Sequence, residues 1–152
     1  MKIRSNMTVE QKVKSVAETI EGLTYVFENW TKADIRIERL PLPAMVNLLP
    51  VSGSFKLKNN QFKDQPNCMF AFFDKSERDS NGLEHDTVVD RCKSLAMEFI
   101  VRLNESGLFE PIEGEISYSV SLDKLSTYVS GIIVSLQLKE VKGVCVSNLT
   151  KR

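Results

Sequence analysis

The chain has 152 residues, of which 42% are hydrophobic and 26% are charged, as in an ordinary globular protein. Lys plus Arg and Asp plus Glu both number 20, and this net charge of zero argues against nucleic-acid binding. No apolar run approaches the roughly 18 residues that span a bilayer, and the N-terminus lacks the apolar core of a signal peptide. We therefore expect a cytoplasmic protein without membrane contact, folded as one α+β domain over residues 1–152.

The first predicted element is a helix over residues 8–21. Thr8 and Gln11 have the spacing of a capping box, in which each side chain bonds the backbone N–H of the other residue. Val and Ala residues then recur at helical spacing, with charged residues such as Lys12 predicted to face water. Gly22 stands where a helix commonly ends in the left-handed conformation.

Three short strands are expected next, and the last of them is predicted to be closed by Pro50 and Ser52-Gly53. Pro41 and Pro43 make the second strand an edge or a connection, because proline cannot donate to a sheet ladder. Trp30 lies in a turn before it and is read either as a core residue or as an interface anchor. The strands are predicted over residues 23–28, 34–40 and 45–51.

The middle of the chain predicts a hairpin turn and then a central strand. Residues 56–64 are polar, and the pair Asn59-Asn60 suits a tight turn. Residues 68–73 are apolar on both faces, which is typical of a central strand that is covered on both sides. The three Phe residues of this strand have no interleaved Lys or Arg, so we interpret them as core rather than as an RNA-stacking platform.

A second helix is predicted over residues 86–106, opening at Thr87 with Asp90 in the acidic capping position and ending at Gly107. Its apolar stripe is predicted to pack on the sheet. The stripe consists of Val88, Cys92, Leu95, Ala96, Phe99, Ile100 and Leu103.

Residues 115–138 alternate strictly and predict a closing hairpin with one buried face, interrupted at Gly131 by an expected bulge. The buried face should hold Ile116, Tyr118, Val120, Leu122, Tyr128, Ile132, Val134, Leu136 and Leu138. Residues 143–152 either belong to the domain or form a loose C-terminal arm. The expected fold is a single α+β domain whose mixed, mostly antiparallel sheet has two helices packed on one face.

Few residues offer chemistry. The loop 77–82 has oxygen-bearing side chains like those of a calcium loop, but Val88 stands where the bidentate glutamate would have to be, so we expect no metal. His85 lies between Glu84 and Asp86 and could act as an acid or base, yet no Ser or Cys lies at a known catalytic spacing from it, so we interpret it as a surface histidine. The three cysteines, Cys68, Cys92 and Cys145, form no C-x-x-C pair and are expected to be free, buried thiols.

The order of elements resembles that of the tail terminator and minor tail proteins of long-tailed phages over about residues 8–141. Residues 42–50, 68–74 and 131–138 are also similar to proteins of prophages and mobile elements of gut Bacteroidetes. The resemblance implies a small α+β protein that forms a ring at the end of the tail tube. That family has no catalytic motif to transfer to this sequence.

We therefore expect no catalytic residue, no cofactor and no metal site. The leading hypothesis is a non-enzymatic subunit of a phage or prophage tail that forms a homo-oligomeric ring and contacts tail-tube or other virion proteins. It would reside in the host cytoplasm and in the virion. The alternative is a small intracellular binding module for a peptide or ligand, and an enzyme using His85 and the acidic loop 74–86 is the third class.

Overall fold

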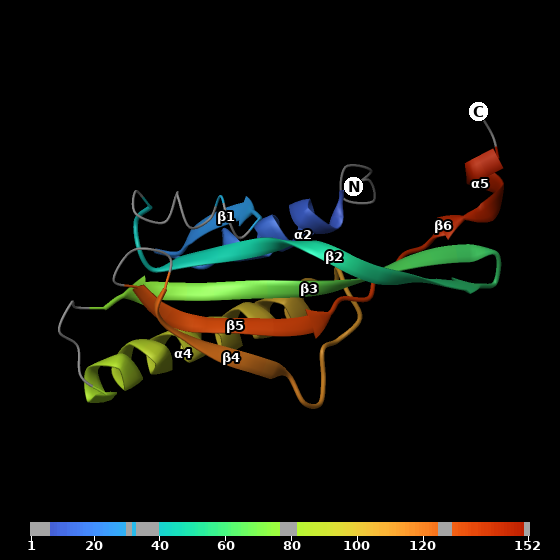
Figure 1. Ribbon diagram of the computed structural model, residues 1–152. Helices are drawn as coiled ribbons and strands as arrows, with labels where there is room; N and C mark the ends of the chain where they lie inside the picture. The colour runs from blue at the N-terminus through green and yellow to red at the C-terminus, as the bar shows by residue number, and fades with distance from the viewer. Residues whose placement is uncertain (1–6, 30–31, 33–39, 77–81, 125–128, 151–152) are drawn as a thin grey trace.

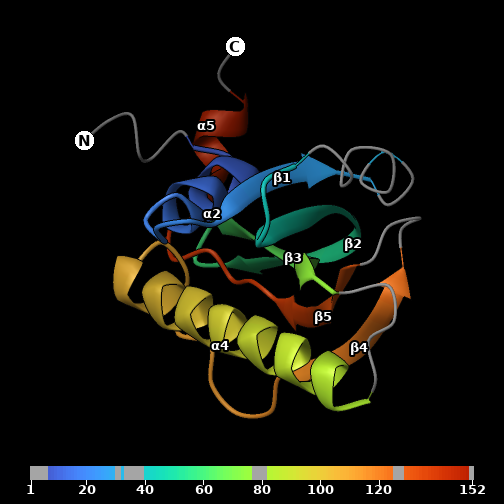
Figure 2. The same ribbon diagram turned by 90° about the vertical axis from the view of Figure 1, so that its left-hand side faces the viewer.

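The chain forms one mixed sheet with its two longer helices packed on the same face (Figures 1 and 2). This computed structural model describes residues 7–29, 32, 40–76, 82–124 and 129–150. In chain order the elements are α2 (Val9–Ala17), β1 (Thr24–Glu28), β2 (Ala44–Lys58), β3 (Gln61–Lys75), α4 (Gly82–Ser106), β4 (Ser117–Lys124), β5 (Val129–Gln137), β6 (Val144–Cys145) and α5 (Val146–Thr150).

The strand order is β1-β2-β3-β5-β4, and β6 pairs with the end of β3. Only the β1–β2 pair is parallel among the described strands, and the others are antiparallel. The predicted α+β class, the mostly antiparallel sheet and the helices on one face are therefore confirmed. Trp30, Tyr128, most of the loop 77–82 and residues 34–39 of the predicted strand 34–40 lie outside the described residues; Leu40, the last residue of that prediction, is not in a strand.

The first helix has the predicted capping box. Thr8 Oγ1 accepts a hydrogen bond from the backbone N–H of Gln11 (3.2 Å), and Gln11 Oε1 accepts one from the N–H of Thr8 (2.9 Å). Gly22 has a φ of 81°, but the helix ends at Ala17, earlier than predicted.

Lys12 does not face water, contrary to the prediction. Its side chain is buried against Phe109, and its Nζ lies 3.3 Å from Glu140 Oε2. A long aliphatic stem can cover apolar surface when its charge finds a partner. Because that partner comes from the far end of the chain, helical periodicity gave no sign of it.

The second helix begins at Gly82, four residues before the predicted start. Thr87 is therefore inside the helix rather than its cap, and its Oγ1 donates to the carbonyl of Leu83 (3.0 Å). Gly107 has a φ of 69° and follows the last helical residue, as predicted. The predicted stripe packs on the sheet, with Leu95 and Ile100 only partly buried at its margin.

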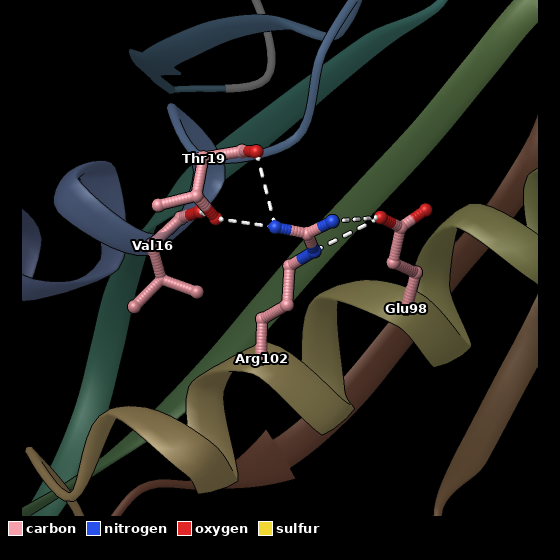
Figure 3. A network of polar contacts seen from close by, with 4 residues as sticks. All are labelled: Val16, Thr19, Glu98 and Arg102. Atoms are coloured by element: carbon pink, nitrogen blue, oxygen red, sulfur yellow. Dashed lines mark hydrogen bonds and ion pairs between the residues drawn. The ribbon is translucent and has the colours of Figure 1, made fainter.

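Arg102 joins the two helices (Figure 3). Its Nη1 donates to the carbonyl and hydroxyl oxygens of Thr19, just after α2, at 3.1 and 3.3 Å. Its Nε donates to Glu98 Oε2 one turn earlier in α4, at 2.9 Å. One side chain thus satisfies a carbonyl of the turn after α2 and fixes that turn to α4.

The core has two parts, one on each face of the sheet, and β3 contributes to both. Phe70 and Phe72 lie on the helix side, where both rings contact Phe99 of α4 at centroid distances of 5.3 and 6.0 Å. Ala71 and Phe73 lie on the other side with residues of β1, β2 and β5. The prediction of a central, doubly covered strand is confirmed, except that Met69 is 43% exposed.

The closing hairpin is present, but its first strand is less buried than predicted. Tyr118 and Val120 are 50% and 51% exposed. They pair with Val134 and Ile132 and so share the helix side of the sheet, but β4 is an outermost strand and α4 packs mainly on β3 and β5. The prediction of which face of β4 points to the helix side was right, but these residues are less buried than predicted because β4 is an edge strand. At Tyr118, α4 reaches it through the side chain of Lys93, whose Nζ lies 5.1 Å from the ring centroid.

Gly131 lies where the ladder is irregular, as the sequence predicted. The β4–β5 register shifts between Ser121, the partner of Gly131, and Lys124. A Cβ atom on Gly131 would lie 1.8 Å from the carbonyl oxygen of Phe72. The glycine therefore allows β5 to approach β3 more closely than any side chain would permit.

The prediction that the apolar strand 45–51 is closed by Pro50 and Ser52-Gly53 is wrong. β2 continues to Lys58. Pro50 has no backbone N–H to donate to the sheet, and it lies in a register shift between Leu48 and Ser52, where the regular pairing with β3 is interrupted. The predicted Asn59-Asn60 turn is confirmed, with φ values of 54° and 59°. Of the residues after Gly143, Val144 and Cys145 form β6, which pairs with the end of β3, and residues 146–150 form the short helix α5, which has no buried residue.

Candidate interaction surface

Beyond Leu48, the β2–β3 hairpin extends past α2 and α4 and projects from the body of the molecule (Figure 1). We call residues 52–67 of this hairpin the arm. Its β3 edge is partly covered, because the backbone N–H groups of Leu138 and Glu140 donate to the carbonyls of Pro66 and Asp64 and β6 pairs farther out. On its β2 edge no described strand pairs with residues 52–58.

One face of the arm is apolar. Leu57 is the cross-strand partner of Phe62, which in turn faces Val144 of β6, and Phe55 faces Asp64. Directly opposed residues point to the same side of a sheet. The Phe55 ring packs edge-on against Phe62, at a centroid distance of 6.2 Å, yet Phe55 remains 75% exposed and Leu57 57% exposed.

This apolar face continues the side of the sheet that the helices cover. Along β3, Phe62 and Asp64 alternate in phase with Cys68, Phe70 and Phe72, which belong to the helix-side core. Neither core cluster includes the apolar residues of the arm. The sheet therefore offers an amphipathic extension that no described helix covers.

Beside Phe55 the same face is hollowed. The hollow has a volume of about 320 Å³ and is lined by Ser52, Gly53, Ser54, Phe55, Asp64 and Pro66. A Cβ on Gly53 would lie 3.0 Å from the Cα of Pro66, so a side chain at this position would crowd the partner strand, and glycine avoids that contact. A protruding ring next to a shallow hollow suits contact with another side chain.

The opposite face of the arm is polar and basic. It holds Ser54, Lys56 and Lys58 on β2, and Gln61, Lys63 and Gln65 on β3. Because Lys56 and Lys63 are direct cross-strand partners, their charges repel each other, so this face favours an acidic partner.

Cys145 lies at the edge of the arm, next to Gln61. The side chain and backbone of Ser147 hydrogen-bond its sulfur and lower the pKa of the thiol. This cysteine is only partly buried, contrary to the expectation of three buried thiols.

Cys68 and Cys92 are buried and free, as predicted. Burial disfavours the thiolate, and it raises the pKa of each thiol to about 12. The sulfur of Cys92 donates to the carbonyl of Ser130 (3.7 Å). Neither group is a nucleophile at neutral pH, since the thiolate is the reactive form.

His85 is half-buried in the first turn of α4, and its Nδ1 lies 3.2 Å from Ser130 Oγ. The sequence could not show this pair because the two residues are 45 positions apart. Ser130 has no exposed surface, however, and a catalytic serine must reach its substrate. The contact therefore positions the start of α4 on β5.

Among the described residues no group of three His, Cys, Asp or Glu side chains could hold a metal ion. In the same part of the chain no helix is both long and apolar enough to cross a membrane. Of the sequence-predicted calcium-like loop, the structure describes only Gly82, which is the first residue of α4.

The sequence did not identify two separate surfaces: the exposed pair Phe55 and Leu57 on the arm, and the edge of β4 on the other side of the sheet. The alternation of Phe55 and Leu57 with lysines is visible in the sequence, but alternation is also the pattern of an ordinary half-buried strand. Only the three-dimensional arrangement shows that the helices stop short of them. No protein-family model and no curated protein sequence matches this chain.

Proposed function

We propose that this protein is a non-enzymatic subunit of a phage or prophage tail. In this proposal it assembles in the host cytoplasm into a homo-oligomeric ring, contacts tail-tube or other virion proteins and becomes part of the virion. The observation that carries the proposal is the arm, whose apolar face has no cover in the described structure.

The physical reason is the free energy of exposed apolar surface. Phe55 and Leu57 point from a projecting hairpin into water, at 75% and 57% exposure. Burying apolar surface gains about 25 cal/mol per Å², and contiguous exposed apolar patches commonly mark interaction sites. An assembly subunit needs such surfaces rather than reactive groups.

The architecture supports the same proposal. The helix, three strands, second helix and closing hairpin follow the order that resembles tail terminator and minor tail proteins. The described residues also place β2 of the arm and β4 at opposite sides of one sheet, and subunits of a ring require two different surfaces.

A small binding module is the second candidate, and the bare edge of β4 favours it. An extended peptide can add a strand to such an edge through main-chain hydrogen bonds. In that case the partner would be a peptide, and the arm would not be needed for binding.

The test is native mass spectrometry and sedimentation over a range of concentrations, with and without a tail-tube protein of the same prophage. Wild type should form an oligomer or bind the tube protein, and Phe55→Ser/Leu57→Ser should lose this association. Met97→Ser/Val101→Ser is the matched control, because it removes two apolar side chains of α4 that are 64% and 55% exposed. A wild-type monomer without affinity for the tube protein would contradict the proposal.

A further inference from the structure

Besides the outer edge of the short strand β1, two strand edges of this sheet lack a partner strand among the described residues, and these two lie on opposite sides. β1 pairs with β2 only from Ala44 to Leu48, which leaves the outer edge of β2 bare along the arm. On the other side, β4 is the outermost strand and pairs only with β5. Unpaired edges present backbone N–H and C=O groups that can extend a sheet into another chain.

The two edges have matching apolar pairs. On the arm, Phe55 and Leu57 point to one side, two residues apart, and are largely exposed. On β4, Tyr118 and Val120 have the same spacing and are half exposed. If the edges pair, these four side chains can form one apolar row, because residues two apart share a face.

The charges of the arm edge and of the segment that leads into β4 are also complementary, while on β4 itself Lys93 of α4 lies over the Tyr118 ring, with its Nζ 5.1 Å from the ring centroid. Lys56 and Lys58 lie on the arm edge. The segment leading into β4, residues 103–116, contains no Lys or Arg and four acidic residues, Glu105, Glu110, Glu113 and Glu115. Glu113 and Glu115, immediately before β4, are both exposed. Opposite charges on two surfaces favour their encounter and fix their register.

Resting on the proposed function, we propose that the arm edge of β2 in one copy pairs antiparallel with β4 of a second copy of this chain. Pairing Phe55 with Val120 and Leu57 with Tyr118 places Lys58 diagonal to Glu115, within reach of a long side chain. Because the contact joins opposite edges, each copy uses both, and the sheet continues from subunit to subunit around a ring.

The experiment uses charge reversal on each edge of the full chain, with self-association measured by sedimentation and native mass spectrometry. Lys56→Glu/Lys58→Glu and Glu113→Lys/Glu115→Lys should each weaken association by at least about tenfold. Combining all four changes in one chain should restore it, and so should mixing the two variants. Glu18→Lys/Glu21→Lys is the control for net charge, and thermal melts show that each variant is folded.

The outcomes distinguish this contact from the proposed function. If Glu113→Lys/Glu115→Lys associates as wild type does, the arm–β4 contact is overturned. That result would instead indicate that the arms of two copies pack on each other, because such a contact does not involve the β4 edge. Loss of association without rescue in the combined variant would also overturn the arm–β4 contact. A wild type that binds tube protein but never itself would overturn both the second-copy contact and the homo-oligomeric ring, and only the contact with tail-tube protein would stand. An oligomer that survives the charge reversals would overturn the arm–β4 contact alone and leave the proposed function standing.

Discussion

Replacing Phe99 by Ala should remove a large part of the stability of the fold. Phe99 has no exposed surface and contacts the rings of Phe70 and Phe72 on the central strand. Deleting a buried Phe side chain costs about 3–5 kcal/mol, and each lost aromatic pair adds about 0.5–1.5 kcal/mol beyond its buried area. We therefore expect a loss in the free energy of unfolding near the top of that range.

Urea denaturation followed by circular dichroism measures this loss, with the m-value checked for a change in the unfolded state. Leu95→Ala, at the margin of the same stripe, should cost about 1–2.5 kcal/mol, because the side chain is only partly buried. Met97→Ala is the matched control on the exposed face of α4 and should change stability by less than about 0.5 kcal/mol. A cost below about 1 kcal/mol for Phe99→Ala would refute the packing of α4 on β3.

Three further predictions concern backbone approach, burial and the contact between helices. Gly131→Ala should lower the free energy of unfolding by more than about 3 kcal/mol in urea denaturation, because its Cβ would lie 1.8 Å from the Phe72 carbonyl oxygen. Gly82→Ala is the control: no atom lies within 4 Å of its added Cβ, so it should be neutral or slightly stabilising in the same measurement. Burial raises the pKa of Cys92 to about 12, so its contribution to stability is complete below pH 9 and should decline above it by up to about 1.4 kcal/mol per pH unit. Replacing Cys92 by Ala should reduce the pH dependence measured by urea denaturation and leave the part that comes from the equally shifted Cys68. Cys145→Ser, at a partly buried thiol whose pKa is lowered, should not reduce it. Arg102→Ala should cost about 1–1.5 kcal/mol in urea melts through its lost bonds to the turn after α2, and a cost no larger than that of Glu98→Ala would contradict this role.

Much of the fold could be predicted because the signals are local. The capping box at Thr8, the stripe of α4, the stop at Gly107 and the Asn59-Asn60 turn each depend on a few neighbouring residues. Their physical basis is the geometry of one helix or one turn. The apolar run at residues 68–73 likewise identified the central strand, because only a strand covered on both faces is apolar on both.

The errors arose where distant residues decide the outcome. Lys12 is buried because Glu140, far along the chain, supplies its counter-charge. Tyr118 and Val120 remain half exposed because β4 is an edge strand, and the sequence does not give the order of strands. The strand that contains Pro50 continues to Lys58 because β3 pairs with it on both sides of a register shift between Leu48 and Ser52, and the sequence near Pro50 does not show this pairing.

The candidate surface was less predictable than the fold. The alternation of Phe55 and Leu57 with lysines looks like that of any strand with one buried face. Whether that face is covered depends on where α2 and α4 end relative to the arm, which no local pattern encodes. The Ser130–His85 contact has the same origin, since it forms only when α4 packs on β5.

The central claim is that this chain is a tail-assembly subunit that acts through its arm. Electron microscopy of tail tubes incubated with the protein tests it most directly. Wild type and Met97→Ser/Val101→Ser should add a ring of subunits at tube ends, and Phe55→Ser/Leu57→Ser should leave the ends bare. Bare tube ends with all three proteins, or equal rings with all three, would contradict the account.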